Sequence, residues 1–392
     1  MSGAAGFSPL VAESAAPVRR PRLRRTAALL IGFLAFLWFA LVADRILGSG
    51  QLDEVLAAIW RVSDDPATLA GQWIAASLLG LIRLVPDAGP QTLVLATTLG
   101  AGGLIGVLFL RLRRAGWGFA EALAAVTLLA LHPAMLMLAT TGQTLLLSVM
   151  VTGIVILCLD RAASVGDAQS LMALGLMLAV LMLTAPDALY VVLPIAAILP
   201  VCLRGVQDLG SAAALYLIIL FPSAVAVGGI LLGAATMGEA PALAFHRWLA
   251  PMHGALETAG SAWLNLRGGA FFAPLLALLP VFLAAMPPAL LALAALVLRP
   301  EERRRPVAAG LALLGGPLSG AGATLFWHAA GPLPAIAVGM AAVLAWTVSR
   351  RATRPERLAW LAAMALGLGL SWGSGWIWEG ADMAAWRAAL PL

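Results

Sequence analysis

The chain consists of apolar runs long enough to cross a bilayer, separated by polar segments that carry most of its charge. A transmembrane helix needs about 20 apolar residues, each adding about 1.5 Å. The pattern predicts an all-α fold, a polytopic helical bundle of about eleven transmembrane helices. The predicted spans are 26–47, 91–110, 119–137, 144–159, 170–184, 188–203, 212–236, 271–298, 307–327, 333–348 and 358–372.

The segment between the first two spans, residues 48–90, has a different pattern. Apolar residues recur there at helical spacing at Leu52, Val55, Leu56 and Ile59. A second apolar stretch, 69–86, is interrupted by Gln72 and Arg83. We expect two amphipathic helices lying in the membrane interface, with Trp60 and Trp73 as anchors. Alternatively, the second stretch enters the membrane and returns to the same side as a re-entrant segment, which would leave the topology unchanged.

Arginine and acidic residues fall in alternate loops along the chain. Cytoplasmic loops of membrane proteins are enriched in basic residues. The arginines of the loops assigned to the cytoplasm are at 19–25, 111–114, 161, 204, 299–305 and 350–357, whereas the first loop on the other side holds Asp53, Glu54, Asp64, Asp65 and Asp87. This pattern predicts a cytoplasmic N-terminus, a C-terminus on the opposite side and an acidic first loop facing away from the cytoplasm.

The composition excludes an ordinary soluble protein. Hydrophobic residues make up 62% of the chain and charged residues 11%, against about 25% charged residues in globular domains. The net charge of +5 does not indicate nucleic acid, because the arginines adjoin apolar spans and suit anionic lipid. Every basic residue other than histidine is arginine, which favours a bacterial source and hence the inner membrane. Cys158 and Cys202 provide neither a disulfide framework nor metal-ligand spacing.

These patterns divide the chain into three parts. Residues 1–25 are predicted to be a disordered basic cytoplasmic N-terminus, and 26–204 a transmembrane core that includes the external loop 48–90. Residues 205–392 supply the remaining spans and a second external loop, 237–269. No internal repeat is visible, which disfavours transporters built from inverted halves.

The residues that could carry chemistry lie mainly in the external loops. Asp53 and Glu54 follow the first span, where a carboxylate can deprotonate an acceptor next to a lipid-linked donor. The alternative is a pair of solvated acids near a helix N-terminus. Within the spans, His132 near the outer end of the third span is the main ionisable candidate, and we interpret it as a helix-end polar group.

Arginines on the external side form a second group of candidates. Arg83, Arg247, Arg267 and the neighbouring His246 are placed there against the usual depletion of positive charge. Guanidinium groups bind phosphate in bidentate fashion, so these residues are candidate donor-phosphate ligands. Contacts with lipid headgroups, or ion pairs with Glu239 or Glu257, are the alternative.

The order of these features resembles the GT-C superfamily of polyprenyl-phosphate-dependent glycosyltransferases, particularly the lipid A aminoarabinose and protein O-mannosyl transferase types. The resemblance covers about residues 19–204. It rests on Asp53-Glu54 after the first helix, on Trp73–Pro86 in the place of an interfacial helix, and on the stretches LRRAGWGFAEALAAVTLLALHPAMLMLATTG and LGLMLAVLMLTAPDALYVVLP. It implies transfer of a sugar from a polyprenyl-phosphate carrier to a periplasmic acceptor, with Asp53 or Glu54 as base and arginines on the donor phosphate.

The sequence departs from that family in several respects, one of which bears directly on catalysis. The family often has a second acidic residue after the proline-bearing span, where this chain reads TTGQ. A non-catalytic subunit or lipid-binding scaffold with a membrane-protein partner therefore stays open as an alternative, and a transporter or flippase is less favoured. No cofactor or metal site is predicted, and a divalent-metal requirement is left open.

Overall fold

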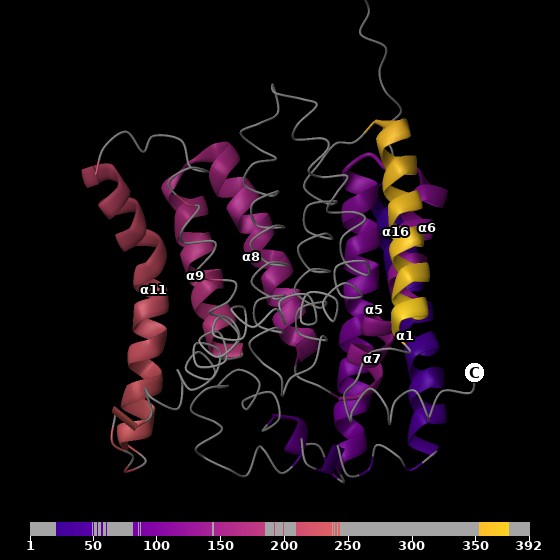
Figure 1. Ribbon diagram of the computed structural model, residues 1–392, viewed down its shortest axis with the longest axis horizontal. Coiled ribbons are helices and arrows are strands. Elements are labelled where there is room, and N and C mark those ends of the chain that lie inside the picture. The colour runs from indigo at the N-terminus through magenta and orange to yellow at the C-terminus, as the bar shows by residue number, and fades with distance from the viewer. Residues whose placement is uncertain are drawn as a thin grey trace, which may run out of the picture.

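The computed structural model describes residues 21–48, 50, 53, 56, 57, 60, 81–84, 86, 88–142, 145–184, 192, 199, 209–236, 238, 240, 242, 243 and 353–375. All regular secondary structure within these residues is helical (Figure 1). Within this described part of the chain, four helices are long and apolar enough to cross a membrane, namely Leu23–Gly48, Pro90–Arg114, Leu146–Ala163 and Ala212–Thr236. The chain is therefore a multi-pass membrane protein.

Eight helices can be followed in the described residues. They are α1 (Pro21–Gly48), α5 (Pro90–Arg114), α6 (Phe119–Ala130), α7 (Pro133–Thr140), α8 (Leu145–Val165), α9 (Ala168–Thr184), α11 (Leu209–Thr236) and α16 (Arg354–Gly375). Helices are thus confirmed at the predicted spans 26–47, 91–110, 144–159, 170–184, 212–236 and 358–372. The predicted spans 271–298, 307–327 and 333–348, and nearly all of 188–203, lie outside the described residues, so eleven spans remain a prediction.

The helices stand roughly side by side (Figure 1). α11, α9 and α8 form a row in which each packs on the next, and α1, α5, α6, α7 and α16 form a second group. Contacts of α8 with α5 and α7 join the two. Buried apolar side chains such as Phe39, Phe109, Met135 and Ile156 form one continuous core across them.

Glycines bring α1 and α5 into backbone contact. A Cβ atom added at Gly106 would lie 2.8 Å from the Ala28 carbonyl oxygen, and one at Gly102 would lie 2.7 Å from Phe36 Cβ. The order of these contacts, Ala28 with Gly106 and Phe36 with Gly102, makes the two helices antiparallel. Glycines spaced four apart are typical of close helix packing in membranes, where small residues let backbones approach.

This packing places several arginines at one end of the bundle. Because α1 and α5 are antiparallel, Arg25 at the start of α1 lies at the same end as Arg111–Arg114 at the end of α5. An ion pair between Glu121 and Arg357 brings the starts of α6 and α16 to that end. We call it the arginine end, and the opposite end, where α1 stops and α5 begins, the distal end.

The third predicted span, 119–137, is not one helix. α6 ends at Ala130 and α7 begins at Pro133, because proline has no N–H to continue the ladder and its ring clashes with the preceding turn. At the break, His132 N donates to Leu129 O (3.1 Å), and Trp372 Nε1 on α16 donates to Leu131 O (3.1 Å). His132 therefore lies buried between helices of 12 and 8 residues, not near an outer end as the sequence suggested.

A tight turn joins α8 to α9 at the arginine end. Gly166 has φ +70°, a conformation that favours glycine. Asp167 then caps α9 by accepting a hydrogen bond from Ser170 N at its Oδ1 atom (2.8 Å). Hydrogen bonds from the side chain and the backbone N–H of Ser170 hold the pKa of Asp167 below its usual value. The two helices consequently form an antiparallel hairpin.

The contact at the glycines predicts that alanine variants at neighbouring positions of α5 differ in stability. We expect Gly102→Ala and Gly106→Ala each to destabilise the protein by about 1–3 kcal/mol, because the new methyl group must displace α1. Gly103→Ala is the matched control: nothing lies within 4 Å of its added Cβ, and alanine favours helix. Thermal unfolding in one detergent measures all three, and equal midpoints would contradict the close packing.

Candidate functional site

Asp53 lies just beyond the distal end of α1. The chain leaves the helix through Gly50, whose N–H donates to Leu47 O (3.0 Å) and whose φ is +68°. Asp53 N then lies 3.4 Å from Gly50 O, and Asp53 is helical with its side chain exposed. The structure therefore presents the predicted acidic residue to the surroundings directly after the first helix.

Leu56 anchors this segment to the bundle. Its side chain is only 1% exposed. A Cβ atom added at Gly142, in the turn after α7, would lie 3.0 Å from Leu56 Cδ2 and 3.2 Å from Leu93 Cβ. Leu56 thus packs beside the turn after α7, close to the start of α5, while Asp53, one helical turn earlier, stays accessible.

Arg83 connects the two stretches that were predicted to be interfacial. Its Nη2 donates to the Trp60 carbonyl (2.7 Å), and its guanidinium carbon lies 4.9 Å from the centroid of the Trp60 ring. A cation–π contact of this kind contributes about 0.5–1 kcal/mol at an exposed site. Arg83 therefore links Trp60 to the segment 81–84, and its predicted role as a phosphate ligand stays a prediction.

The other predicted site residues are Glu54, His246, Arg247 and Arg267, and they lie outside the described residues. Of the predicted set, the structure thus describes Asp53 and Arg83. Both belong to the connection between the distal ends of α1 and α5. Within the described residues, no group of three or more His, Cys, Asp or Glu side chains could hold a metal ion.

Threonines occupy the distal end where the GT-C resemblance would place a second acid. Thr140 and Thr141 are buried, and their hydroxyls donate to Leu136 O and Met137 O, each at 2.7 Å. The hydroxyl of Thr97 lies 2.9 Å from Ala139 O and so links α5 to α7. These hydroxyls satisfy backbone carbonyls and stabilise the helix ends. They supply no titratable group for proton transfer.

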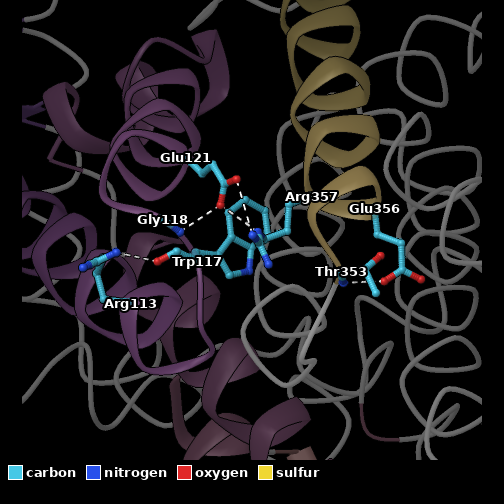
Figure 2. Close-up of polar contacts among 7 residues, drawn as sticks. All are labelled: Arg113, Trp117, Gly118, Glu121, Thr353, Glu356 and Arg357. Atoms are coloured by element: carbon cyan, nitrogen blue, oxygen red, sulfur yellow. Dashed lines mark hydrogen bonds and ion pairs between the residues drawn. The ribbon is translucent and has the colours of Figure 1, made fainter. Parts of the chain in front are cut away.

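A second polar cluster, at the arginine end, fastens α16 to α6 (Figure 2). Glu121 Oε2 accepts hydrogen bonds from Gly118 N (2.8 Å) and from Arg357 Nε (2.6 Å), as Figure 2 shows. The Glu121 and Arg357 side chains are 17% and 16% exposed. Nearby, Arg113 Nη1 donates to the Trp117 carbonyl and holds the turn between α5 and α6. Sequence reasoning assigned Arg357 only to orientation and did not single out Glu121.

Three comparisons were made, with protein-family models, with curated proteins and with solved structures. None of them found a match for this chain. The assignment of a function therefore depends on the residues of the chain and on their arrangement.

The Glu121–Arg357 pair should be energetically coupled. Glu121→Gln keeps the acceptor for Gly118 N but loses the charge, and Arg357→Gln leaves the carboxylate half-buried without its cation. Hydrogen bonds to charged groups contribute about 1.5–3 kcal/mol, so we expect each single variant to lose stability of that order. The double variant should lose little more than one single variant, because both changes remove the same interaction.

Thermal unfolding of the four proteins of this cycle in detergent measures the coupling. Glu356→Gln is the control, because it removes the neighbouring carboxylate but keeps an oxygen that can accept from Thr353 N. Additive losses in the double variant would contradict a direct ion pair between α6 and α16.

Proposed function

We propose that this protein is a GT-C-like membrane glycosyltransferase that moves a sugar from a polyprenyl-phosphate carrier to an acceptor on the periplasmic side. The observation that supports it best is the exposed Asp53, placed one helical turn from the buried anchor Leu56 at the distal end of α1. In the proposed arrangement, this carboxylate lies at the membrane surface. There it can contact both an acceptor in water and a lipid-linked donor whose polyprenyl chain stays in the bilayer.

The proposed reaction uses Asp53 or Glu54 as the general base. The carboxylate takes the proton from an acceptor hydroxyl or amine as that atom bonds to the anomeric carbon of the sugar. The bond between this carbon and the carrier phosphate oxygen breaks, and polyprenyl phosphate leaves with the bonding electrons. A positioned base of this kind contributes about 10²–10⁴-fold to the rate.

The carrier phosphate needs cations on the same side of the membrane. We assign this role to Arg247, Arg267 and His246 of the second external loop, together with Arg83. Charge-assisted bidentate hydrogen bonds from arginine suit phosphate oxygens. In the proposed arrangement, the contact of Arg83 with Trp60 holds the interfacial segment beside the bound carrier.

The proposed orientation of the protein in the membrane is based on the positions of its arginines. The arginine end, with Arg25, Arg111–Arg114 and Arg357, faces the cytoplasm of a bacterial inner membrane, and the distal end with Asp53 faces the periplasm. About eleven spans then give a cytoplasmic N-terminus and a periplasmic C-terminus. The site would act on lipid-linked sugars in the outer leaflet of that membrane.

A second candidate is a non-catalytic relative that serves as a subunit or lipid-binding scaffold in envelope assembly. The observation that favours it lies at the end of α7 and in the turn that follows. There, Thr140 and Thr141 bond to helix carbonyls in the place where an acidic residue often stands in the family. Such a protein would keep the helical bundle and contact a membrane-protein partner, with Asp53 as a solvated surface acid.

Replacing the acidic pair distinguishes the two candidates. Asp53→Asn and Glu54→Gln keep the side-chain size and remove the carboxylate that a base requires. We expect the variant that lacks the base to lose transfer by about 10²–10⁴-fold. Its folding should be unchanged within about 0.5 kcal/mol for the exposed Asp53. The measurement is transfer of labelled sugar from polyprenyl-phosphate-linked donors in purified membranes.

Asp167→Asn is the matched control, because it removes an exposed carboxylate at the opposite end of the bundle and asparagine caps helices equally well. Full transfer by Asp53→Asn, by Glu54→Gln and by the double variant would exclude the pair from catalysis. Absence of transfer by the unmodified protein with every carrier tried would count in favour of the scaffold.

A further inference from the structure

A groove with a volume of about 600 Å³ runs along the joint between α1 and α5. Its floor contains Gly32, Gly103 and Gly106, and Phe33, Phe36 and Leu99 are among its walls. The close approach of the two helices creates it, because the glycines that allow the backbone contact also leave no side chains to fill the space above it. Its volume falls within the range of about 300–1,000 Å³ typical of ligand pockets.

The length of the groove corresponds to one leaflet of a bilayer. Its lining on α1 extends from Arg25 to Phe36, eleven residues further along the helix. At about 1.5 Å per residue this is about 17 Å, close to half of a hydrocarbon core about 30 Å thick. A groove of this length accommodates an extended acyl chain that enters from the arginine end.

The groove faces outward from the bundle. The side chains along it include Leu29, Leu99 and Val107, which are 76%, 62% and 57% exposed. In a protein that crosses the membrane several times, such a face meets lipid tails. Phe33 and Phe36, with ring centroids 6.2 Å apart, form an aromatic wall on the α1 side.

Positively charged residues lie at the end of the groove nearest the arginine end of the bundle. Arg25 lines the groove directly. On α5, Leu99, Gly103, Val107 and Leu110 lie along one helical stripe, and one turn beyond Leu110 the same stripe reaches the exposed Arg114. The first turn of α1 has no acidic residue, and the last turn of α5 holds Arg111, Arg113 and Arg114. These arginines therefore favour an occupant whose polar end, at this end of the groove, is negatively charged.

We propose that the α1–α5 groove is a binding site for one anionic phospholipid of the leaflet at the arginine end. One acyl chain lies over Gly32, Gly103 and Gly106, and the phosphate is bound by Arg25 and Arg114. Apolar walls of leaflet length and cations at the interface match the two parts of such a molecule. The site is separate from the distal end and does not depend on the proposed glycosyl transfer.

The test is retention of lipid by the purified full-length protein. Protein in detergent is mixed with phosphatidylglycerol or with phosphatidylcholine, and bound lipid is counted by native mass spectrometry. We expect one phosphatidylglycerol to be retained in preference to phosphatidylcholine. Arg25→Gln should weaken its binding by roughly tenfold or more, the usual effect of losing a charged hydrogen bond.

Two further variants locate the lipid in the groove. Gly103→Leu should abolish retention, because its side chain fills the floor of the groove and its Cβ meets no atom within 4 Å. Arg45→Gln should retain lipid normally, because Arg45 is an exposed arginine in the last turn of the same helix, at the distal end. Unfolding temperatures near that of the unmodified protein confirm that the variants fold.

Two results would overturn the proposal. Equal retention of both lipids with no effect of Arg25→Gln would show that the groove does not select an anionic headgroup. A change in oligomeric state with Gly103→Leu, with phosphatidylglycerol retained as before, would show that the groove seats a helix of another protein chain.

Discussion

The backbone contact of α1 with α5 decides which parts of the chain lie together. With glycine at 102 and 106, the helices approach until the Ala28 carbonyl and Phe36 Cβ occupy the space of the missing side chains. In a bilayer, apolar side chains gain little from leaving lipid, so close van der Waals packing of this kind has to hold helices together. The antiparallel register then follows, and with it the gathering of Arg25 and Arg111–Arg114 at one end.

Both functional proposals depend on this register. At the distal end, the same packing places the end of α1 beside the start of α5, and there the buried Leu56 and Leu93 of α5 both lie next to Gly142. In the proposed function, the buried Leu56 holds Asp53, one helical turn earlier, beside the membrane surface. At the arginine end, the glycines leave an open groove that finishes at Arg25. A bulkier residue at Gly106 would alter both ends together.

Much of the fold could be predicted from hydropathy, because a membrane span requires a long apolar run. The boundaries of α1, α5 and α11 extend only a few residues beyond those expected. The break between α6 and α7 was missed, although Pro133 is a local signal, because hydropathy does not change across it. The spacing of Gly102 and Gly106 could also have indicated the packing of α5, but not its partner, which depends on the facing residues of α1.

The candidate site was predictable only in part. The exposure of Asp53 agrees with the expectation for an acidic residue after the first span. The contact of Arg83 with Trp60 could not be foreseen, because it joins residues 23 positions apart through a backbone carbonyl and a ring face. The same holds for Glu121 and Arg357, which are 236 positions apart and meet only because α6 and α16 lie side by side.

The proposed reaction requires the arginine end to face the cytoplasm, and the same orientation would place the α1–α5 groove in the cytoplasmic leaflet. Single cysteines are introduced at Asp65, Arg114 and Arg305 in a chain with Cys158 and Cys202 replaced by serine. A membrane-impermeant thiol reagent is then added to intact cells. We expect labelling at 65, and none at 114 or 305 until the cells are opened. Labelling at 114 or 305 in intact cells, with 65 protected, would contradict this orientation.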